Sequence, residues 1–169
     1  MKNFKRTIGI LIFMLVFGNV LFAQDVSAML ESYSKNFDKS DINAKLMLIE
    51  DAVKQDKAGL APLFKHAIDY AVGVSFRGQS VSVLRQICLK AIEQVRKFNH
   101  QDARRSLWKL FKKDTDSNMR IQVLKALGTV GKGDAEIVGY INDWLGEQNN
   151  IYETGKNLNK SVIAQCVTS

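Results

Sequence analysis

The side chains with the clearest chemical potential are basic and lie close together in the middle of the chain. Residues 85–113 carry nine lysines and arginines against two acidic residues. Within this stretch, Arg105, Lys109 and Lys112 recur at i, i+4 and i+7, a spacing that places them on one face of a helix. A rise of about 1.5 Å per residue makes this basic strip about 10 Å long. Such a strip fits an acidic partner, although most charged helix faces are simply solvated.

Two aromatic residues border the basic strip. Trp108 lies beside Leu107 and is either an exposed anchor next to the strip or a residue that packs against the neighbouring helix pair. Tyr140 is expected to point outward and is a further candidate for the same surface. Trp144 falls on an apolar stripe with Ile137, so it is predicted to belong to the core.

Residues suited to catalysis or metal binding are scarce. His66 and His100 are the only histidines, and His66 stands three residues before Asp69, a possible ligand pair without a third ligand at a suitable spacing. Residues 114–118 resemble the opening of a calcium loop, but methionine and lysine occupy its sixth and twelfth positions. Helix capping explains this run better. We therefore expect no catalytic residue, no metal site and no cofactor.

The two cysteines are expected to be buried free thiols. Cys88 and Cys166 both fall on apolar stripes, with two repeat units between them. Packed helices lie about 8–10 Å apart, whereas a disulfide requires Cα atoms within about 7 Å. Neither cysteine has the exposed, positively charged surroundings of a reactive thiol.

Residues 1–23 have the organisation of an export signal. Three basic residues precede an apolar run over 8–22, and Ala23 supplies a small residue for cleavage before Gln24. The alternative is an uncleaved membrane anchor, but the run is short for a span of about 20 residues. Removal of this segment lowers the formal net charge from +7 to +4, because it takes away three basic residues and no acidic ones. We expect a periplasmic or extracellular protein.

The elements that carry these side chains are all expected to be helices. The chain has a single proline, alternating β-branched runs are scarce, and apolar residues recur at helical spacing. Aspartates stand at four expected helix starts (Asp41, Asp102, Asp116 and Asp134), and residues 131–133 form a glycine stop. The expected helices are 25–37, 42–54, 61–74, 81–98, 102–113, 116–130, 135–146 and one that starts at 159, with a polar loop over 147–158.

The helices also repeat. Residues 84–95 align without a gap with residues 119–130, 35 residues later, and a fixed period of this length is typical of stacked units that share a core. The pattern of Asp116, Met119-Arg120, Val123 and Ala126-Leu127-Gly128, followed by Gly131, Gly133 and Asp134, resembles a HEAT repeat, including bacterial forms related to phycocyanobilin lyases. The resemblance extends to units 41–75, 81–113, 116–146 and a partial unit 159–169. Leu46 and Lys160 occupy the usual arginine position in the first and last of these units.

This resemblance implies a fold and a mode of action. The fold would be a right-handed α-solenoid of about three and a half helical hairpins over 41–169, with residues 24–40 as an N-terminal capping helix. The second helix of each pair would line the concave side and bind other macromolecules.

Together these features predict an exported, non-enzymatic scaffold. Its basic concave face (Arg105, Lys109 and Lys112, with Trp108 and Tyr140) would bind an acidic protein or an anionic envelope component. Nucleic acid is disfavoured, because export removes the chain from it and no aromatic residues interleave with the charges. Membrane association would require an uncleaved signal or head-group contact. Two alternatives are a lyase-like or chaperone role on a small ligand, and a structural fragment that assembles end to end.

Overall fold

The computed structural model describes residues 25–76, 80–154 and 158–168, and these residues contain helices and turns but no strand. The prediction of an all-α fold is therefore confirmed. The expected export segment lies outside the described residues. The elements are residues 25–39, α2 (Ile42–Gln55), the short 3-10 helix η1 (Ala58–Leu60), α3 (Ala61–Gly73), α4 (Val81–Lys97), the short 3-10 helix η2 (Gln101–Ala103), α5 (Arg104–Lys113), α6 (Ser117–Val130), α7 (Ala135–Glu153) and α8 (Lys160–Thr168).

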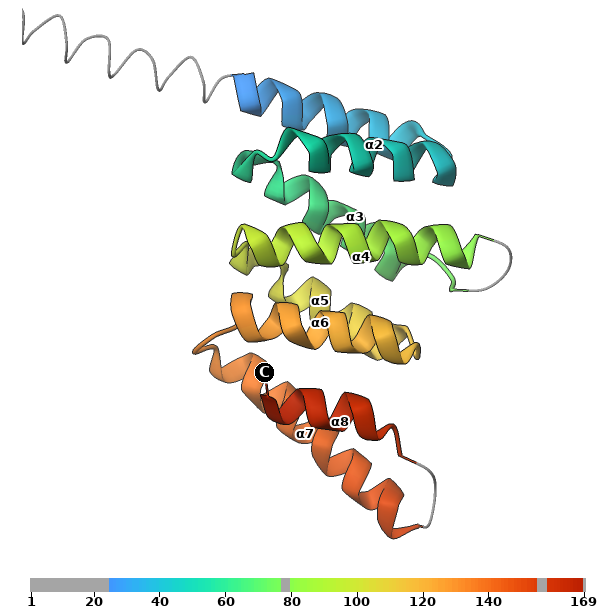
Figure 1. The fold of residues 1–169 in the computed structure, drawn as a ribbon, viewed down its shortest axis with the longest axis vertical. Helices are drawn as coiled ribbons and strands as arrows, with labels where there is room; N and C mark the ends of the chain where they lie inside the picture. Colours follow the sequence, from blue (N-terminus) through green and yellow to red (C-terminus); the bar gives the residue numbers. More distant parts are fainter. Residues whose placement is uncertain (1–24, 77–79, 155–157, 169) are drawn as a thin grey trace, which may run out of the picture.

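The helices follow one another through space in the order of the chain, from residues 25–39 at one end to α7 and α8 at the other (Figure 1). α2, α4, α6 and α8 contact one another in succession, and α3, α5 and α7 do the same. In addition, α3 contacts α4 and α5 contacts α6. The second helix of one pair thus packs on the first helix of the next, and the buried residues form one continuous core.

Most of the predicted apolar faces are buried. Ala91 on α4 and Ala126 on α6, which occupy equivalent places in the aligned segments, are both fully buried, and their helices contact each other. The predicted inward face of α3 is buried throughout: Leu63, Phe64, Ala67, Ile68 and Ala71 are each 0% exposed. The spacing of apolar residues was therefore a sufficient guide to these faces.

Three of the four expected aspartate caps are confirmed. Asp41, Asp116 and Asp134 accept hydrogen bonds from backbone amides two or three residues later, at 2.9–3.3 Å, and so satisfy amides that the first turn leaves free. The prediction for Asp102 is wrong. The 3-10 helix η2 precedes α5, so that Ala103 is the N-cap and no side chain bonds to the first amides.

The turn after α6 depends on its glycines, as predicted. A Cβ atom at Gly131 would lie 2.8 Å from the carbonyl oxygen of Leu127, closer than real side chains come. Gly133 has a φ of +79°, a conformation that costs glycine little and other residues more. The helix therefore ends at Val130, and the chain turns into the Asp134 cap of α7.

Helix α7 is longer than the sequence suggested. We expected a loop over 147–158, but the helix continues to Glu153. No proline or glycine interrupts residues 147–153, so their polarity gives the helix an exposed side without breaking it. Ile151 remains partly buried on the other side.

Three basic side chains cap the carboxyl ends of preceding helices. Lys45, only 4% exposed, donates to the carbonyl oxygens of Phe37, Asp38 and Ser40. Lys113 donates to those of Val72 and Val74 at the end of α3. Arg120 donates to those of Phe111 and Asp114 at 3.1 and 2.9 Å. Cations at these positions donate to carbonyl groups that the last turn of a helix leaves without an amide partner. They are also stabilised by the negative end of the helix dipole.

Residues 46 and 53 on α2 are less buried than expected. We predicted an inward face of Leu46, Ile49 and Val53, but the buried residues are Lys45, Ile49 and Ala52. The buried face is thus rotated toward Lys45, whose side chain reaches the carbonyl of Phe37 in helix 25–39. Lys45 thus caps a preceding helix as Arg120 does. It stands one position before Leu46, the residue that aligns with the usual arginine position of the first unit.

Candidate binding surface

Helix α5 presents the basic strip predicted from the sequence. The side chains of Arg105, Lys109 and Lys112 are exposed. The opposite face is buried and consists of Ser106, Leu107, Trp108, Leu110 and Phe111. This division follows from the helical period, which separates the two sets. Since α5 carries five basic residues and no acidic one, its exposed face is positive along its whole length.

Arg105 is held by an ion pair to the neighbouring helix. Its guanidinium donates to Oε2 of Glu136 on α7, from Nη2 at 2.9 Å and from Nε at 3.3 Å. This hydrogen bond raises the pKa of Arg105. The pKa of Glu136 is lowered, by the hydrogen bond from Tyr140 first and by that from Arg105 second. The Arg105 side chain is 75% exposed, and exposed pairs of this kind are weak enough to exchange partners.

Lys109 and Lys112 differ from Arg105, because neither has a partner in the part of the chain that the structure describes. Neither makes a hydrogen bond or an ion pair with any residue in the described ranges. The other two cations of α5 are engaged, since Arg104 pairs with Asp134 at 2.5 Å and Lys113 caps α3. Lys109 and Lys112 therefore carry the part of the strip's charge that the fold leaves uncompensated.

The helix beside the strip is acidic. α7 contacts α5, contains no lysine or arginine, and carries four acidic residues, Glu136, Asp143, Glu147 and Glu153. The surface therefore has a positive area on α5 beside a negative area on α7. The acidic side chains of α7 partly neutralise the basic strip at its Arg105 end. Sequence reasoning missed the acidic helix, although the composition of residues 135–153 contains the signal.

The aromatic residues beside the strip form a stack rather than a set of exposed anchors. Trp108 is only 6% exposed, and its ring lies parallel to those of Phe111 and Tyr140, with centroids 5.0 and 5.6 Å away. Trp108 thus follows the packing alternative, and its ring is not free to bind a partner. Trp144, 9% exposed, meets Phe111 edge-on at 5.1 Å, as expected of a core residue. The stack fixes α5 against α7.

Tyr140 is the one aromatic residue of the predicted set that reaches the surface. It is partly buried by Trp108, and its hydroxyl donates to Oε1 of Glu136 at 2.6 Å. That hydrogen bond raises the pKa of Tyr140. Glu136 accepts hydrogen bonds from both Tyr140 and Arg105, so a single carboxylate holds both side chains in place at this end of the surface.

The run 114–118 serves the fold, as the capping interpretation predicted. Asp114 is 1% exposed and receives Nε and Nη2 of Arg85 at 3.0 and 2.8 Å. It also accepts the amide of Asp116 at 3.0 Å. Burial alone would raise the pKa of Asp114, but these hydrogen bonds outweigh it and lower the pKa. Among the described residues, no three histidine, cysteine or acidic side chains are grouped as metal ligands.

The possible ligand pair of His66 and Asp69 does not form. His66 Nε2 lies 2.6 Å from Asp38, and Asp69 instead accepts Lys65 at 2.7 Å. His66 thus links α3 to the end of helix 25–39. Sequence spacing could not reveal this, because Asp38 lies 28 residues away.

Both cysteines are buried free thiols, as predicted. Burial raises the pKa of Cys88 to about 12 and that of Cys166 to about 11. Thiols with such pKa values are protonated at neutral pH and are poor nucleophiles.

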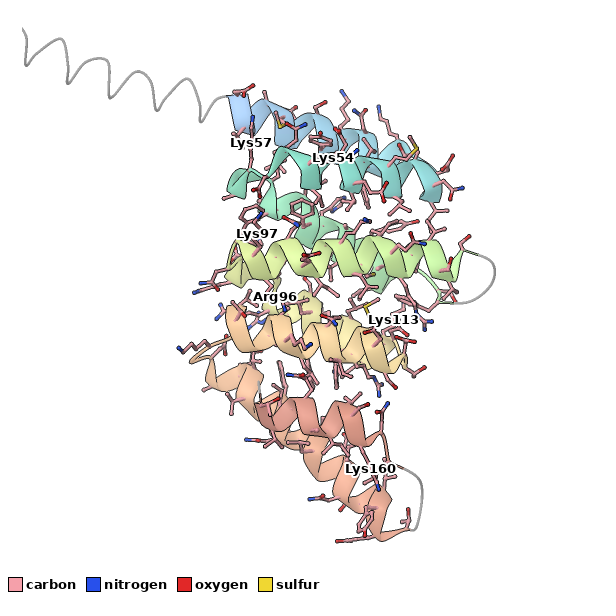
Figure 2. The ribbon with its side chains drawn as sticks, in the orientation of Figure 1. Lys54, Lys57, Arg96, Lys97, Lys113 and Lys160 are labelled. Atoms are coloured by element: carbon pink, nitrogen blue, oxygen red, sulfur yellow. The ribbon has the colours of Figure 1, made fainter. Side chains whose placement is uncertain are left out.

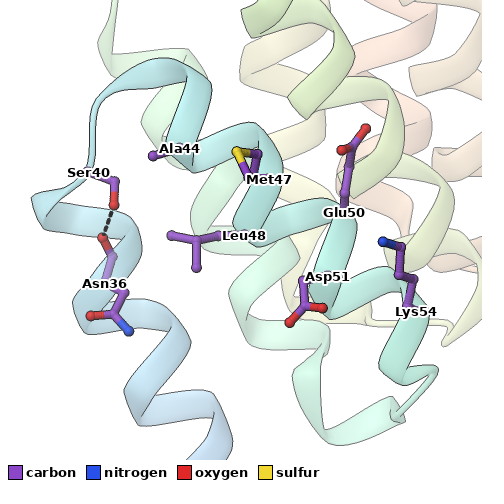
Figure 3. Close-up of a pocket in the computed structure, with 8 residues that line it drawn as sticks. All are labelled: Asn36, Ser40, Ala44, Met47, Leu48, Glu50, Asp51 and Lys54. Atoms are coloured by element: carbon purple, nitrogen blue, oxygen red, sulfur yellow. Dashed lines mark hydrogen bonds between the residues drawn. The ribbon is translucent and has the colours of Figure 1, made fainter.

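A surface hollow of about 600 Å³ lies between helix 25–39 and α2 (Figure 3). Met47, which is 69% exposed, and Leu48 provide its apolar part. Its acidic groups are engaged, since Glu50 pairs with Lys90 and Asp51 accepts Tyr33. This hollow arises from the packing of two helices rather than from a motif, so no sequence pattern indicated it.

No family model matches this chain, and no curated protein or solved structure matches it either. Among the described residues, no helix has the length and hydrophobicity needed to cross a bilayer. Functional inference therefore depends on the surface itself.

Proposed function

We propose that this protein is an exported, non-enzymatic scaffold that binds an acidic segment of a protein partner through the basic strip of α5. In this proposal the stacked helices are a right-handed α-solenoid of the HEAT type, and the second row of helices lines its concave side. The observation that carries the proposal is the pair Lys109 and Lys112. Both are exposed and have no side-chain partner among the residues that the structure describes, on a helix with no acidic residue.

The aromatic stack gives this surface the rigidity that recognition requires. Trp108 of α5 stacks on Phe111 of the same helix and on Tyr140 of α7, and so joins the two helices. The charged side chains therefore project from a backbone that is already fixed before a partner arrives. Preorganisation of this kind lowers the ordering cost of binding.

The two ends of the strip would play different parts. Lys109 and Lys112 are available for first contact, where unpaired charge speeds the encounter with an acidic segment. Arg105 becomes available only when a partner carboxylate replaces Glu136. The acidic helix α7 would repel a partner placed over it, so it favours one orientation along α5.

A charge-reversal experiment tests the proposal. The probe is a synthetic peptide rich in glutamate and aspartate, and its affinity is measured by fluorescence anisotropy at two salt concentrations. Lys109→Glu with Lys112→Glu should weaken binding by roughly tenfold or more, because two attractive contacts become repulsive. The matched control is Lys35→Glu with Lys39→Glu, which changes the net charge equally on helix 25–39, where both side chains are exposed. An equal loss of affinity in both variants would mean that only the net charge of the protein matters, and it would contradict a role for the strip.

A second candidate function is end-to-end self-association. It is favoured by one observation: Val167 on α8 is 77% exposed, at the end of the stack opposite helix 25–39. Light scattering over a concentration series tests it. A mass that rises with concentration and returns to that of a monomer in Val167→Glu would support assembly, and a constant monomer mass would exclude it.

A further inference from the structure

A second basic feature lies on the other row of helices, where the carboxyl ends of α4, α6 and α8 come together. A surface hollow of about 550 Å³ there is lined by Arg96, Lys97, Lys125, Thr129, Gln165 and Thr168. Three of these side chains are basic and none is acidic. We infer that this basic hollow binds a phosphate group, carried by a small soluble molecule or by a lipid head group, independently of the strip on α5.

The charge available in the basic hollow comes from two different helices. Lys97 pairs with Asp56 in the turn after α2, but Arg96 and Lys125 have no partner among the residues that the structure describes. Arg96 is partly buried and lies at the end of α4 near α6 (Figure 2). It also lines an adjoining hollow that contains Glu93, yet the two side chains form no ion pair.

The helix dipoles explain the position of Arg96 better than that of Lys125. Arg96 lies in the last turn of α4, where a cation is favoured by the negative end of the helix. Lys125 sits one turn or more before the end of α6, so the same effect acts on it less, because it is confined to the last turn. Two unpaired cations that converge on one hollow from two helices are costly through mutual repulsion. An anion between them would remove that cost.

Hydroxyl groups complete the set of donors. Thr129 Oγ1 donates to the carbonyl of Lys125 in its own helix at 3.4 Å, and Thr168 Oγ1 donates to the carbonyls of Ala164 and Gln165 at 3.3 and 3.2 Å. Bonds of this length are weak, so either hydroxyl can turn toward an incoming oxygen at little cost. Gln165 Nε2 lies 3.2 Å from Thr168 Oγ1, which holds this side of the hollow together.

The donor set matches phosphate better than a single carboxylate. A guanidinium binds two oxygens at once, and a lysine supplies a second point charge. With two hydroxyls, donors approach from three helices, as a tetrahedral oxyanion requires. The hollow is an open surface depression rather than a closed cavity, so a phosphate carried by a larger molecule can reach it.

The carboxyl ends of the helices disfavour an anion at this site. Because α4, α6 and α8 end near the hollow, their partial negative charges oppose an anion. Lys97, the third cation of the hollow, is paired with Asp56, so Arg96 and Lys125 supply most of the charge that opposes this field. Arg96→Gln with Lys125→Gln should therefore abolish binding rather than merely weaken it.

The experiment uses the full chain with inorganic phosphate and then with glycerol phosphate, each at constant ionic strength. Binding is followed by the NMR signals of the Arg96 Nε–H and the Thr129 and Thr168 amides. We expect saturable shifts that disappear in Arg96→Gln/Lys125→Gln, and that persist in Lys35→Gln/Lys132→Gln. The control removes the same charge from two exposed lysines outside the hollow. Non-saturating shifts, or an equal affinity in the site variant and the control, would overturn the inference.

The source of the phosphate is decided in a second arm. Phosphatidylcholine vesicles with and without phosphatidic acid are sedimented with each variant. Sedimentation that depends on phosphatidic acid and on Arg96 and Lys125 identifies a head group. Saturable binding of glycerol phosphate without such sedimentation identifies a soluble ligand. Failure of both arms rejects the site, while leaving the peptide binding proposed for α5 untouched, so the two proposals fail separately.

Discussion

Arg85 on α4 and Asp114, in the turn between α5 and α6, form a two-point ion pair that joins one helix pair to the next. Nε donates to Oδ2 at 3.0 Å and Nη2 to Oδ1 at 2.8 Å, while Asp114 is 1% exposed. Asp114 also accepts a hydrogen bond from the backbone amide of Asp116, the N-cap residue of α6. The pair therefore connects the packing between helix pairs to the start of α6.

Loss of Arg85 should destabilise the whole stack. Arg85→Ala leaves the Asp114 carboxylate buried without its main partner, and breaking a buried ion pair in this way costs about 3 kcal/mol. Urea denaturation followed by circular dichroism measures the free energy of unfolding. The control is Arg104→Ala, whose partner Asp134 is 17% exposed against 1% for Asp114, although the two arginines are equally exposed; it should cost about 1 kcal/mol or less. Similar losses in the two variants would contradict a special role for the Arg85 pair.

The same carboxyl should give the protein a defined acid sensitivity. Asp114 has a folded-state pKa below its ordinary value, so its contribution to stability is fully present above about pH 4 and is lost as the pH falls through the folded-state pKa. In Arg85→Ala the main group that lowers this pKa is missing, so the folded-state pKa moves back toward its ordinary value and the acid-dependent loss due to this carboxyl should shrink. Unfolding free energies measured from neutral pH down to about pH 3 check this. Parallel curves for wild type, Arg85→Ala and Asp114→Asn would contradict it.

The aromatic stack should contribute strongly to stability. Trp108→Ala removes a large side chain that is 6% exposed and lies between Phe111 and Tyr140, and such truncations cost about 3–5 kcal/mol. Trp108→Phe keeps most of the contact and should lose much less. Denaturant midpoints measure both. If Trp108→Ala unfolds at the wild-type midpoint while peptide binding is lost, Trp108 would be a contact residue rather than a core residue.

Local features of this fold were predictable because their causes lie within a turn or two of helix. The caps at Asp41, Asp116 and Asp134 and the stop at Gly131 depend on neighbours a few residues away. The burial of Cys88 follows equally from its place on an apolar stripe. Helical period and capping chemistry are sufficient to find all of these.

Long-range polar contacts were not predictable in the same way. Lys113 caps the end of α3 some 40 residues earlier, as its bonds to Val72 and Val74 show, and it appeared in the sequence only as one more charge of the basic segment. Lys45 likewise sits on α2 where an apolar residue would be expected. A hydrophobic pattern cannot distinguish a solvated lysine from one that is buried on carbonyl groups, because the partner belongs to another helix.

The pairing of Arg105 with Glu136 was missed for the same reason, and it yields the sharpest test of the binding surface. In the free protein, Glu136 holds the guanidinium of Arg105 at 2.9 Å and the hydroxyl of Tyr140 at 2.6 Å. A partner carboxylate must compete with this internal one. Glu136→Gln removes the competing charge and frees Arg105, and it also removes a repulsive carboxylate from the edge of the strip. The affinity for the acidic peptide should therefore rise by roughly twofold to fivefold, the range expected for one exposed charge.

The matched variant for this test is Glu147→Gln, which removes the same charge from a later turn of α7 and has no ion pair among the described residues. It should raise the affinity less, since it acts only through the general field. In Arg105→Gln/Glu136→Gln the gain that depends on Arg105 should vanish, because the freed guanidinium is gone. Fluorescence anisotropy with the same peptide measures all three. A gain that is equal in Glu136→Gln and Glu147→Gln, and that survives the loss of Arg105, would mean that Glu136 acts only as a distant charge and that Arg105 takes no part in binding.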